Sequence, residues 1–346
     1  MRALKILLII VVSVAALLVL LSLLGPSTTV VERTVAIHAP DSVVYPRIAS
    51  LETMHGWSPW AEADRDQETA FHGTDATVGS KQTWTGDTVG SGSMEVTALE
   101  PYRHVGLDLR FTEPFASQSQ VDFDLAADGD TTHVTERVTT ENGFMARIVC
   151  LFMDPEAMMG PIFEQGLNNL RGQAEAAHAE ARAAIAARTV NGHLIDTVER
   201  PETVYVGRRN KRVKWTDLSR FHGESYAAAG GALGALGVEP GVPTGLYYEW
   251  NEQDRSADLL AGFAVQAPGD LVVPGMDVVV VPASRMLHVA HRGAYDGLGA
   301  AHEALGTYIA RNDITHYGHV IEEHAIGPPQ QPDTALWLTH IYYMVR

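Results

Sequence analysis

The stretch VERTVAIHAPDSVVYPRIASLETMHGWSPW, residues 31–60, combines a strand pattern and a helix pattern within a short length of chain. Val31, Val35 and Ile37 alternate with polar side chains, which predicts a β-strand with one buried face. A short helix is expected to begin at Asp41, because an acidic side chain favours the first turn of a helix. The stretch ends in an aromatic loop that contains two tryptophans.

The chain beyond residue 60 has the pattern of antiparallel strands followed by one long helix. Turn residues separate five expected strands: Lys81–Thr85, Gly92–Leu99, His104–Phe111, Gln120–Ala126 and Thr132–Thr139. A helix is expected from about Pro155 to Arg188, since apolar residues recur there at three- and four-residue spacing: Met159, Phe163, Leu167, Leu170 and Ala174. A curved sheet needs a cover for its concave face, and this amphipathic helix supplies one. An apolar pocket is expected between them.

Residues 31–60, together with VGSGSMEVTALEPYRHV (89–105) and FEQGLNNLRGQAE (163–175), resemble the SRPBCC superfamily of START-like and polyketide-cyclase-like domains. The resemblance implies a helix-grip domain over residues 28–190 that binds a lipid, hormone or polyketide, and only some members are enzymes. Aromatic residues are the candidate pocket lining, with ordinary core packing as the alternative: Trp57, Trp60, Trp84, Phe111 and Phe123.

The N-terminal run Ile6–Leu24 has only two polar residues, both serines. As a helix it would extend about 30 Å, enough to cross the hydrocarbon core of a bilayer. Arg2 and Lys5 precede it, which favours a cytoplasmic N-terminus and an extracytoplasmic body. We therefore expect a single-pass transmembrane anchor over residues 1–27, and the alternative is a cleaved signal peptide.

The length, net charge and cysteine content of the chain exclude several classes of function. The chain has 346 residues with 42 acidic and 25 basic side chains, giving a formal net charge of −17. Such a length predicts about two globular units, and such a charge argues against nucleic-acid binding. The one cysteine, Cys150, excludes an internal disulfide and a cysteine zinc site. No cofactor motif or histidine spacing for a metal is visible, so we expect no cofactor and no metal.

From about residue 195 a second mixed pattern begins. The expected helices are Trp215–Ala235 and Leu298–Arg311. Strand-like segments surround them: a first one with Val198, Val204 and Val206, then Tyr247–Trp250, Leu260–Val265, Asp277–Val281, Met286–His291, Val320–Ile326 and His340–Val345. This order predicts a pseudo-duplicated βαββ domain over residues 195–346, and an α+β fold class for the whole chain.

Three stretches of this half are similar to the GyrI-like effector-binding domain, which also follows the DNA-binding part of AraC-type and MerR-type regulators. They are GLYYEWNEQDRSADLLAGFAV (245–265), VPASRMLHVAHRGAYDGLGAAHEALGTYI (281–309) and VIEEHAIGPPQQPDTALWLTHIYYMV (320–345). The resemblance implies a cleft that takes flat, often cationic, apolar molecules between aromatic walls and a buried carboxylate.

The resemblance places that carboxylate at Glu323, by spacing from Thr339, with Glu322 beside it. Strand alternation allows only one of the two to face inward. The expected walls are Tyr248, Trp250, Tyr295 and Trp337. The alternative is a solvated edge with the aromatic residues in the core.

The sequence thus predicts a membrane-anchored protein that binds, and sequesters or senses, a small hydrophobic or cationic amphipathic molecule such as a xenobiotic or a lipid. Two other functions are left open. One is hydrolysis of reactive xenobiotics, with Glu323 as general base on water. The other is a structural or partner-recruiting envelope protein, in which the pockets are filled cores.

Overall fold

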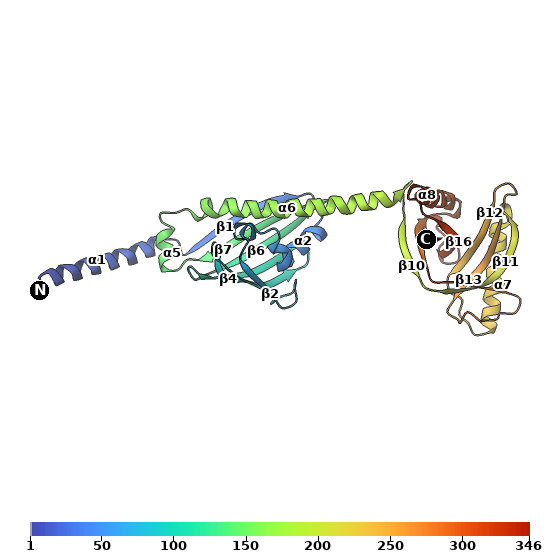
Figure 1. The fold of residues 1–346 in the computed structure, drawn as a ribbon, viewed down its shortest axis with the longest axis horizontal. Coiled ribbons are helices and arrows are strands. Elements are labelled where there is room, and N and C mark those ends of the chain that lie inside the picture. The colour runs from blue at the N-terminus through green and yellow to red at the C-terminus, as the bar shows by residue number, and fades with distance from the viewer. Residues whose placement is uncertain (1) are drawn as a thin grey trace. The chain divides into compact units, whose positions relative to one another are not determined.

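The computed structural model describes residues 2–346 of the chain. The chain divides into two compact units, Met1–Arg182 and Ala183–Arg346. Each is a mixed α+β structure built on one large antiparallel sheet (Figure 1). Helix α1 (Arg2–Leu24) precedes the first sheet and is long and apolar enough to cross a membrane, a property that a signal sequence shares.

The first unit contains a curled, seven-stranded sheet in the order β1-β7-β6-β5-β4-β3-β2. All its pairs are antiparallel, and β7, the last strand in sequence, pairs with β1, the first in sequence. The strands are β1 (Thr28–Ile37), β2 (Glu68–His72), β3 (Lys81–Gly86), β4 (Gly90–Glu100), β5 (His104–Glu113), β6 (Ser117–Asp128) and β7 (Thr131–Glu141). On β1 the buried side chains are Val31, Val35 and Ile37, which confirms the predicted alternation.

Short helices α2 (Asp41–Ala49), α3 (Leu51–His55) and α4 (Pro59–Ala63) connect β1 to β2. Strand β2 was not predicted, because its five residues are mostly exposed and carry no apolar alternation. Helix α5 (Phe144–Val149) was not predicted either, because a helix of six residues is too short to show a 3.6-residue period.

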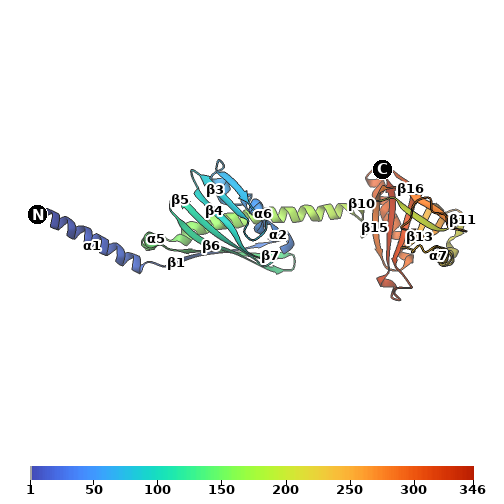
Figure 2. The same cartoon turned by 90° about the horizontal axis from the view of Figure 1, so that it is seen from below.

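Helix α6 (Pro155–Arg188) has the predicted bounds and runs along one face of the sheet (Figures 1 and 2). Its apolar stripe is buried at Phe163, Leu167, Leu170 and Ala174. Leu167, Leu170 and Ala174 join one core cluster with residues of β1, α2 and strands β4–β7. The expectation of a sheet covered by a long helix is therefore confirmed at the level of architecture.

The second unit contains an eight-stranded antiparallel sheet in the order β10-β15-β17-β16-β12-β13-β11-β14. Its strands are β10 (Asp196–Arg200), β11 (Thr203–Lys214), β12 (Pro243–Asn251), β13 (Ser256–Val265), β14 (Asp277–Val281), β15 (Ser284–Arg292), β16 (His316–Ile326) and β17 (Leu338–Val345). Helices α7 (Leu218–Ala235) and α8 (Leu298–Arg311) follow β11 and β15.

The sheet order of this unit is pseudo-symmetric about the β12–β16 pair. From the centre outward one half is β12-β13-β11 and the other is β16-β17-β15, and each half carries its helix between its first and second strand in sequence. The two outermost strands are exchanged between the halves. β10 precedes β11 in sequence but pairs with β15, and β14 precedes β15 but pairs with β11. A duplicated βαββ order is thus present in the fold.

A two-stranded hairpin, β8 (Thr189–Val190) and β9 (His193–Leu194), follows α6. Asn191 and Gly192 have φ angles of 49° and 81° in its turn. Two successive positive φ values define the tight turn that an Asn-Gly pair favours.

Candidate functional sites

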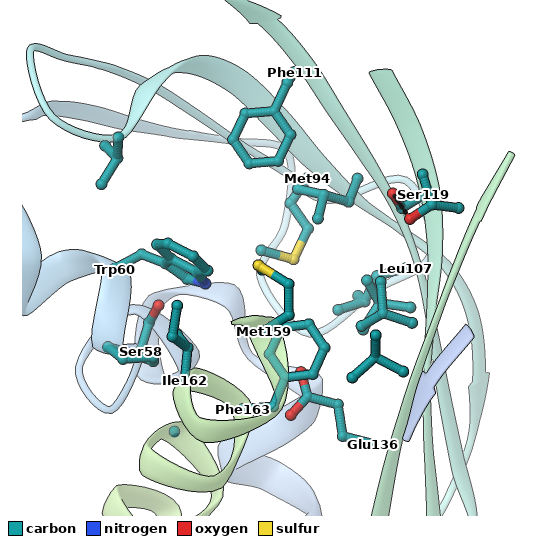
Figure 3. Close-up of a pocket in the computed structure, with 18 of the residues that line it drawn as sticks. Ser58, Trp60, Met94, Leu107, Phe111, Ser119, Glu136, Met159, Ile162 and Phe163 are labelled. Carbon is teal, nitrogen blue, oxygen red and sulfur yellow. Dashed lines mark hydrogen bonds between the residues drawn. The ribbon is translucent and has the colours of Figure 1, made fainter. Parts of the chain in front are cut away.

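A cavity of about 480 Å³ lies within the first unit. Its walls come from the sheet face that α6 covers and from the α3–α4 segment (Figure 3). Most lining side chains are apolar, including Met94 and Leu107 from the sheet and Met159, Ile162 and Phe163 from α6. This volume falls in the range typical of small-molecule sites.

The five aromatic residues that the sequence singled out in this unit all line the cavity: Trp57, Trp60, Trp84, Phe111 and Phe123. Trp57 and Phe123 are buried and pack edge to face, with ring centroids 6.1 Å apart. They belong to the core cluster and to the cavity wall at once, so the two interpretations of these residues coincide. Trp60 is partly exposed, which places it at the rim.

The ring of Trp84, on β3, packs over the neighbouring strand β4. Trp84 pairs with Gly92 across β3 and β4, and its ring packs edge to face on Phe111 at 5.5 Å. A β-carbon at Gly92 would lie 2.5 Å from the Trp84 ring, so only glycine leaves room for the ring to lie flat over β4. The absence of a side chain at Gly92 thereby helps to orient one wall of the cavity.

One acidic side chain, Glu136, faces the cavity among these apolar groups (Figure 3). Among the described residues, none hydrogen-bonds or forms an ion pair with its carboxyl group. Burial alone raises the pKa of Glu136 to about 8. Sequence analysis missed this residue, although Glu136 lies between Val134 and Val138 in the buried phase of a predicted strand, and that position was the signal that could have found it.

In the second unit Glu322 is buried on the side of the sheet that carries α7 and α8. Its Oε1 lies 2.8 Å from Nε2 of His302 on α8, whose Nδ1 is 3.1 Å from the Tyr343 hydroxyl. Burial opposes the charge on Glu322, but the interaction with His302, chiefly its hydrogen bond, favours that charge, and the pKa of Glu322 lies below its ordinary value. Because a carboxylate only accepts, His302 Nε2 carries the shared proton.

Aromatic rings surround Glu322 on this face. Tyr247 and Trp250 stack with centroids 4.4 Å apart, and Trp250 also approaches His302. A register shift in β12 after Tyr247 puts both rings on one face of the strand. Tyr295 packs against Trp337 at 4.7 Å. Three of the four predicted wall residues therefore have their rings in contact with other aromatic groups near Glu322.

Two histidines, His222 and His324, complete this cluster and are held neutral. Burial, with His324 nearby, lowers the pKa of His222 to about 4. Burial also lowers the pKa of His324, whose Nε2 has no hydrogen-bond partner among the described residues. Near neutral pH the cluster thus holds an ionised Glu322 beside two uncharged imidazoles.

The other predicted carboxylate, Glu323, lies on the opposite face of the sheet. Its Oε1 is 2.6 Å from Nη2 of Arg200, which also lies over the Tyr342 ring at 4.2 Å. Tyr248 is on that opposite face too, under the guanidinium of Arg209 at 3.6 Å. The geometry thus assigns the helix-covered face to Glu322, whereas the spacing from Thr339 favoured Glu323. Irregular pairing between β16 and β17 makes such counting unreliable for the phase of a strand.

Within residues 2–346 no group of three or more His, Cys, Asp or Glu side chains has the geometry to hold a metal ion. His288 and His291, three apart on β15, have different partners: His288 Nε2 is 2.9 Å from His340 Nδ1, and His291 Nε2 is 3.1 Å from the Ala294 carbonyl oxygen.

No protein-family model and no curated protein matches the chain. Solved structures match at low identity. The C-terminal domain of EcmrR is 20% identical with a TM-score of 0.40, over 44% of this chain and 98% of that domain. SAV2435 bound to tetraphenylphosphonium is 14% identical (TM-score 0.35; 44% and 93% covered), and Ara h 8.0201 is 11% identical (TM-score 0.32; 44% and 99% covered). The functional interpretation therefore depends on the geometry of this chain's own sites.

Proposed function

We propose that the protein is a membrane-anchored binding protein for small amphipathic molecules, which it sequesters or senses. The observation that carries the proposal is the cavity of about 480 Å³ with an unpaired carboxyl group on an otherwise largely apolar wall. In this proposal the first unit is an SRPBCC-type helix-grip domain and the second is a GyrI-like domain.

The cavity supports a ligand with an apolar body and a cationic or hydrogen-bond-donating group. An apolar wall gains free energy when it is covered, at roughly 25 cal/mol for each Å² removed from water. Pairing of Glu136 with a ligand cation is favourable as well, because a buried carboxyl group without a partner is unfavourable and the cation supplies that partner. The aromatic rings of Trp60 and Trp84 provide faces on which such a cation can also lie.

The second unit supports a further site for the same class of ligand, at Glu322. Its carboxylate is already bound by His302, so a ligand cation would compete with that histidine for Oε1. The stacked Tyr247–Trp250 pair supplies an adjacent aromatic face. We assign the stronger recognition to the first unit, because its carboxyl group has no protein partner to displace.

Anchoring is assigned to residues 1–27, the segment that contains α1 (Arg2–Leu24). The helix is apolar along Lys5–Leu24, and its side chains are almost all exposed in the folded chain, as those of a lipid-facing helix are. With Arg2 and Lys5 before the apolar run, the proposed topology is single-pass with both units on the extracytoplasmic side.

A matched pair of ligands tests the binding proposal: a short alkyltrimethylammonium ion and its neutral isostere with a tert-butyl head group. Titration of the full chain in lipid nanodiscs, corrected for empty nanodiscs, should show binding of the cation. Glu136→Gln removes the Coulomb attraction and should weaken binding of the cation by roughly 1–4 kcal/mol. Binding of the neutral isostere should be unchanged. The control is Glu141→Gln, an exposed glutamate on the same strand. Absence of binding by both ligands would contradict the proposal.

Hydrolysis of reactive xenobiotics is a second candidate function, favoured by the Glu322–His302 hydrogen bond beside an aromatic face. A glutamate and a histidine in contact form an acid–base pair of the kind that activates water. Glu323 lies on the opposite face of the sheet from His302, and its carboxylate is paired with Arg200 at 2.6 Å. If an epoxide probe is turned over, Glu322→Gln and His302→Gln should each abolish turnover; turnover that survives in both excludes this mechanism.

A further inference from the structure

Apolar side chains gather on the surface at one end of the first unit, on α5 and the loop after it. Phe152 is 76% exposed, and six neighbours in sequence are exposed as well: Phe144, Met145, Val149, Leu151, Met153 and Met158. Phe115, in the turn between β5 and β6, is 83% exposed. Contiguous exposed apolar residues of this size are uncommon on a soluble surface and mark a contact with lipid or protein.

This apolar patch, defined as residues 144–158 together with Phe115, lies at the end of the sheet where α1 joins it. β1 begins there and pairs with the end of β7, and Ser119 near the start of β6 pairs with Thr140. The turn that carries Phe115 directly precedes that start of β6. The patch therefore surrounds the point at which the chain leaves α1.

Three residues, Gly25 to Ser27, are all that separate α1 from β1. Even fully extended they reach only about 10 Å, so this end of the sheet cannot lie far from the end of α1. The junction is also fixed by contacts: Asn142 Nδ2 donates to the Pro26 carbonyl oxygen at 3.1 Å, and its backbone N–H donates to that of Ser27 at 2.9 Å. A β-carbon at Gly25 would collide with the carbonyl of Arg147 on α5.

We infer that the apolar patch inserts into the interface of the bilayer that α1 crosses, and so forms a second membrane contact of the first unit. The inference depends on the proposed anchoring by α1. Continuity with α1 decides between lipid and a protein partner, because a short and hydrogen-bonded junction leaves no space for another protein between patch and membrane. Acidic neighbours such as Asp154 and Glu156 give the patch no attraction for anionic lipid, so its insertion depends on apolar burial.

The patch also borders the ligand cavity. Cys150 and Pro155, on either side of Phe152, line the cavity, and so does Met159 at the start of α6. One segment of chain thus separates the cavity from the apolar patch.

Lipid-borne quenching tests the inference on the full chain. In a Cys150→Ser background, an environment-sensitive fluorophore is attached to Phe152→Cys, and in separate proteins to Met145→Cys, Val12→Cys and Val78→Cys. Val12 lies in α1 and reports on the anchor. Val78 is as exposed as Met145, at 61%, and serves as the control. Its loop hydrogen-bonds to Val96, in the half of β4 that is farther from α1. Each protein is reconstituted into phosphatidylcholine vesicles with and without acyl-chain nitroxide lipid.

We expect the nitroxide lipid to cause a loss of fluorescence at Phe152→Cys, Met145→Cys and Val12→Cys, and none at Val78→Cys. Quenching at Val12→Cys alone overturns the inference and leaves the anchor intact. A blue-shifted but unquenched label at Phe152→Cys means that protein covers the patch, which also overturns it. An unquenched label at Val12→Cys overturns the anchor and the inference together.

Discussion

Arg33 and Glu136 are direct partners on β1 and β7, yet their side chains do not pair. Arg33 instead binds two carboxylates of α6: its Nε lies 2.8 Å from Glu164 and its Nη1 lies 3.0 Å from Glu156. A β-carbon at Gly160 would overlap the guanidinium, so glycine lets Arg33 lie against the helix. Arg33 thus joins α6 to the sheet and leaves the Glu136 carboxyl facing the cavity without a cation from the described residues.

The first prediction concerns the pH dependence of cation binding by this cavity. The raised pKa of Glu136, about 8, means that its carboxyl group is mostly protonated at pH 7 and must lose a proton to pair with a cation. Affinity for a quaternary ammonium ion, whose charge does not titrate, should therefore rise about tenfold per pH unit below pH 8 and level off above it. Calorimetric titration between pH 6 and pH 9 measures this. In Glu136→Gln the slope should vanish, and a slope that persists there assigns the proton to another group.

The second prediction concerns Arg200 and Glu323, which form a largely buried ion pair at 2.6 Å. Removing one partner leaves an uncompensated charge, so Arg200→Met should lower the free energy of unfolding of the second unit by roughly 3–5 kcal/mol. Glu323→Gln added to Arg200→Met should restore most of the loss, since no charge then remains buried. Urea denaturation with pulsed hydrogen exchange on peptides of β10 and β16 separates this unit from the first. Equal losses in the single and double variants would show that the charge is not the cause.

Long periodic elements of this fold could be read from the sequence, and short or aperiodic ones could not. α6 shows its apolar stripe over many turns, so its bounds matched. The strands from β3 to β7 are separated by turn residues and show alternation. By contrast β2 is exposed, and α5 presents its apolar side chains to the surface, so neither has a buried face that a periodic pattern could reveal.

The residue types that line the candidate sites were predictable from the sequence, but the face of the strand to which each side chain points was less so. The aromatic lining of the cavity followed from the residue types in the sequence, because Trp and Phe on a curved sheet are buried whether they form core or pocket. The choice between Glu322 and Glu323 depended on strand register, and the bulges in β12 and β16 shift it locally. The position of Glu136 in the buried phase of β7 was visible in the sequence, but its lack of a cation partner was not. Only the packing of α6 determines that the cross-strand residue Arg33 is engaged elsewhere.

The third prediction concerns acid sensitivity of the second unit through His222. Its pKa is about 4 in the folded chain, against an ordinary value of 6.5, because burial opposes its charge. Between pH 6.5 and pH 4 the unfolded chain therefore binds a proton that the folded chain does not. The free energy of unfolding should fall over that window, by up to about 3 kcal/mol from this residue, and be flat above it. His324 acts in the same direction.

The measurement is the same pulsed-exchange denaturation, performed at intervals from pH 4 to pH 7.5. His222→Gln should reduce the slope of the unfolding free energy with pH in this window, whatever its effect on stability at neutral pH. The control is His133→Gln, an exposed histidine of the first unit. An unchanged slope in His222→Gln would place the acid sensitivity elsewhere.

The last prediction separates the two sites by filling one of them. Met94 and Met159 approach each other across the cavity of the first unit (Figure 3), and a larger ring at Met94 has empty volume to enter. Met94→Trp should therefore remove binding of both the cation and its neutral isostere, at a change in unfolding free energy below about 1.5 kcal/mol. The matched control, Leu336→Trp, adds the same side chain at an exposed position of the second unit. Because Glu322 is untouched in Met94→Trp, any binding that remains reports on the second unit. Full binding in this variant would show that the second unit holds the ligand and that the cavity around Glu136 does not.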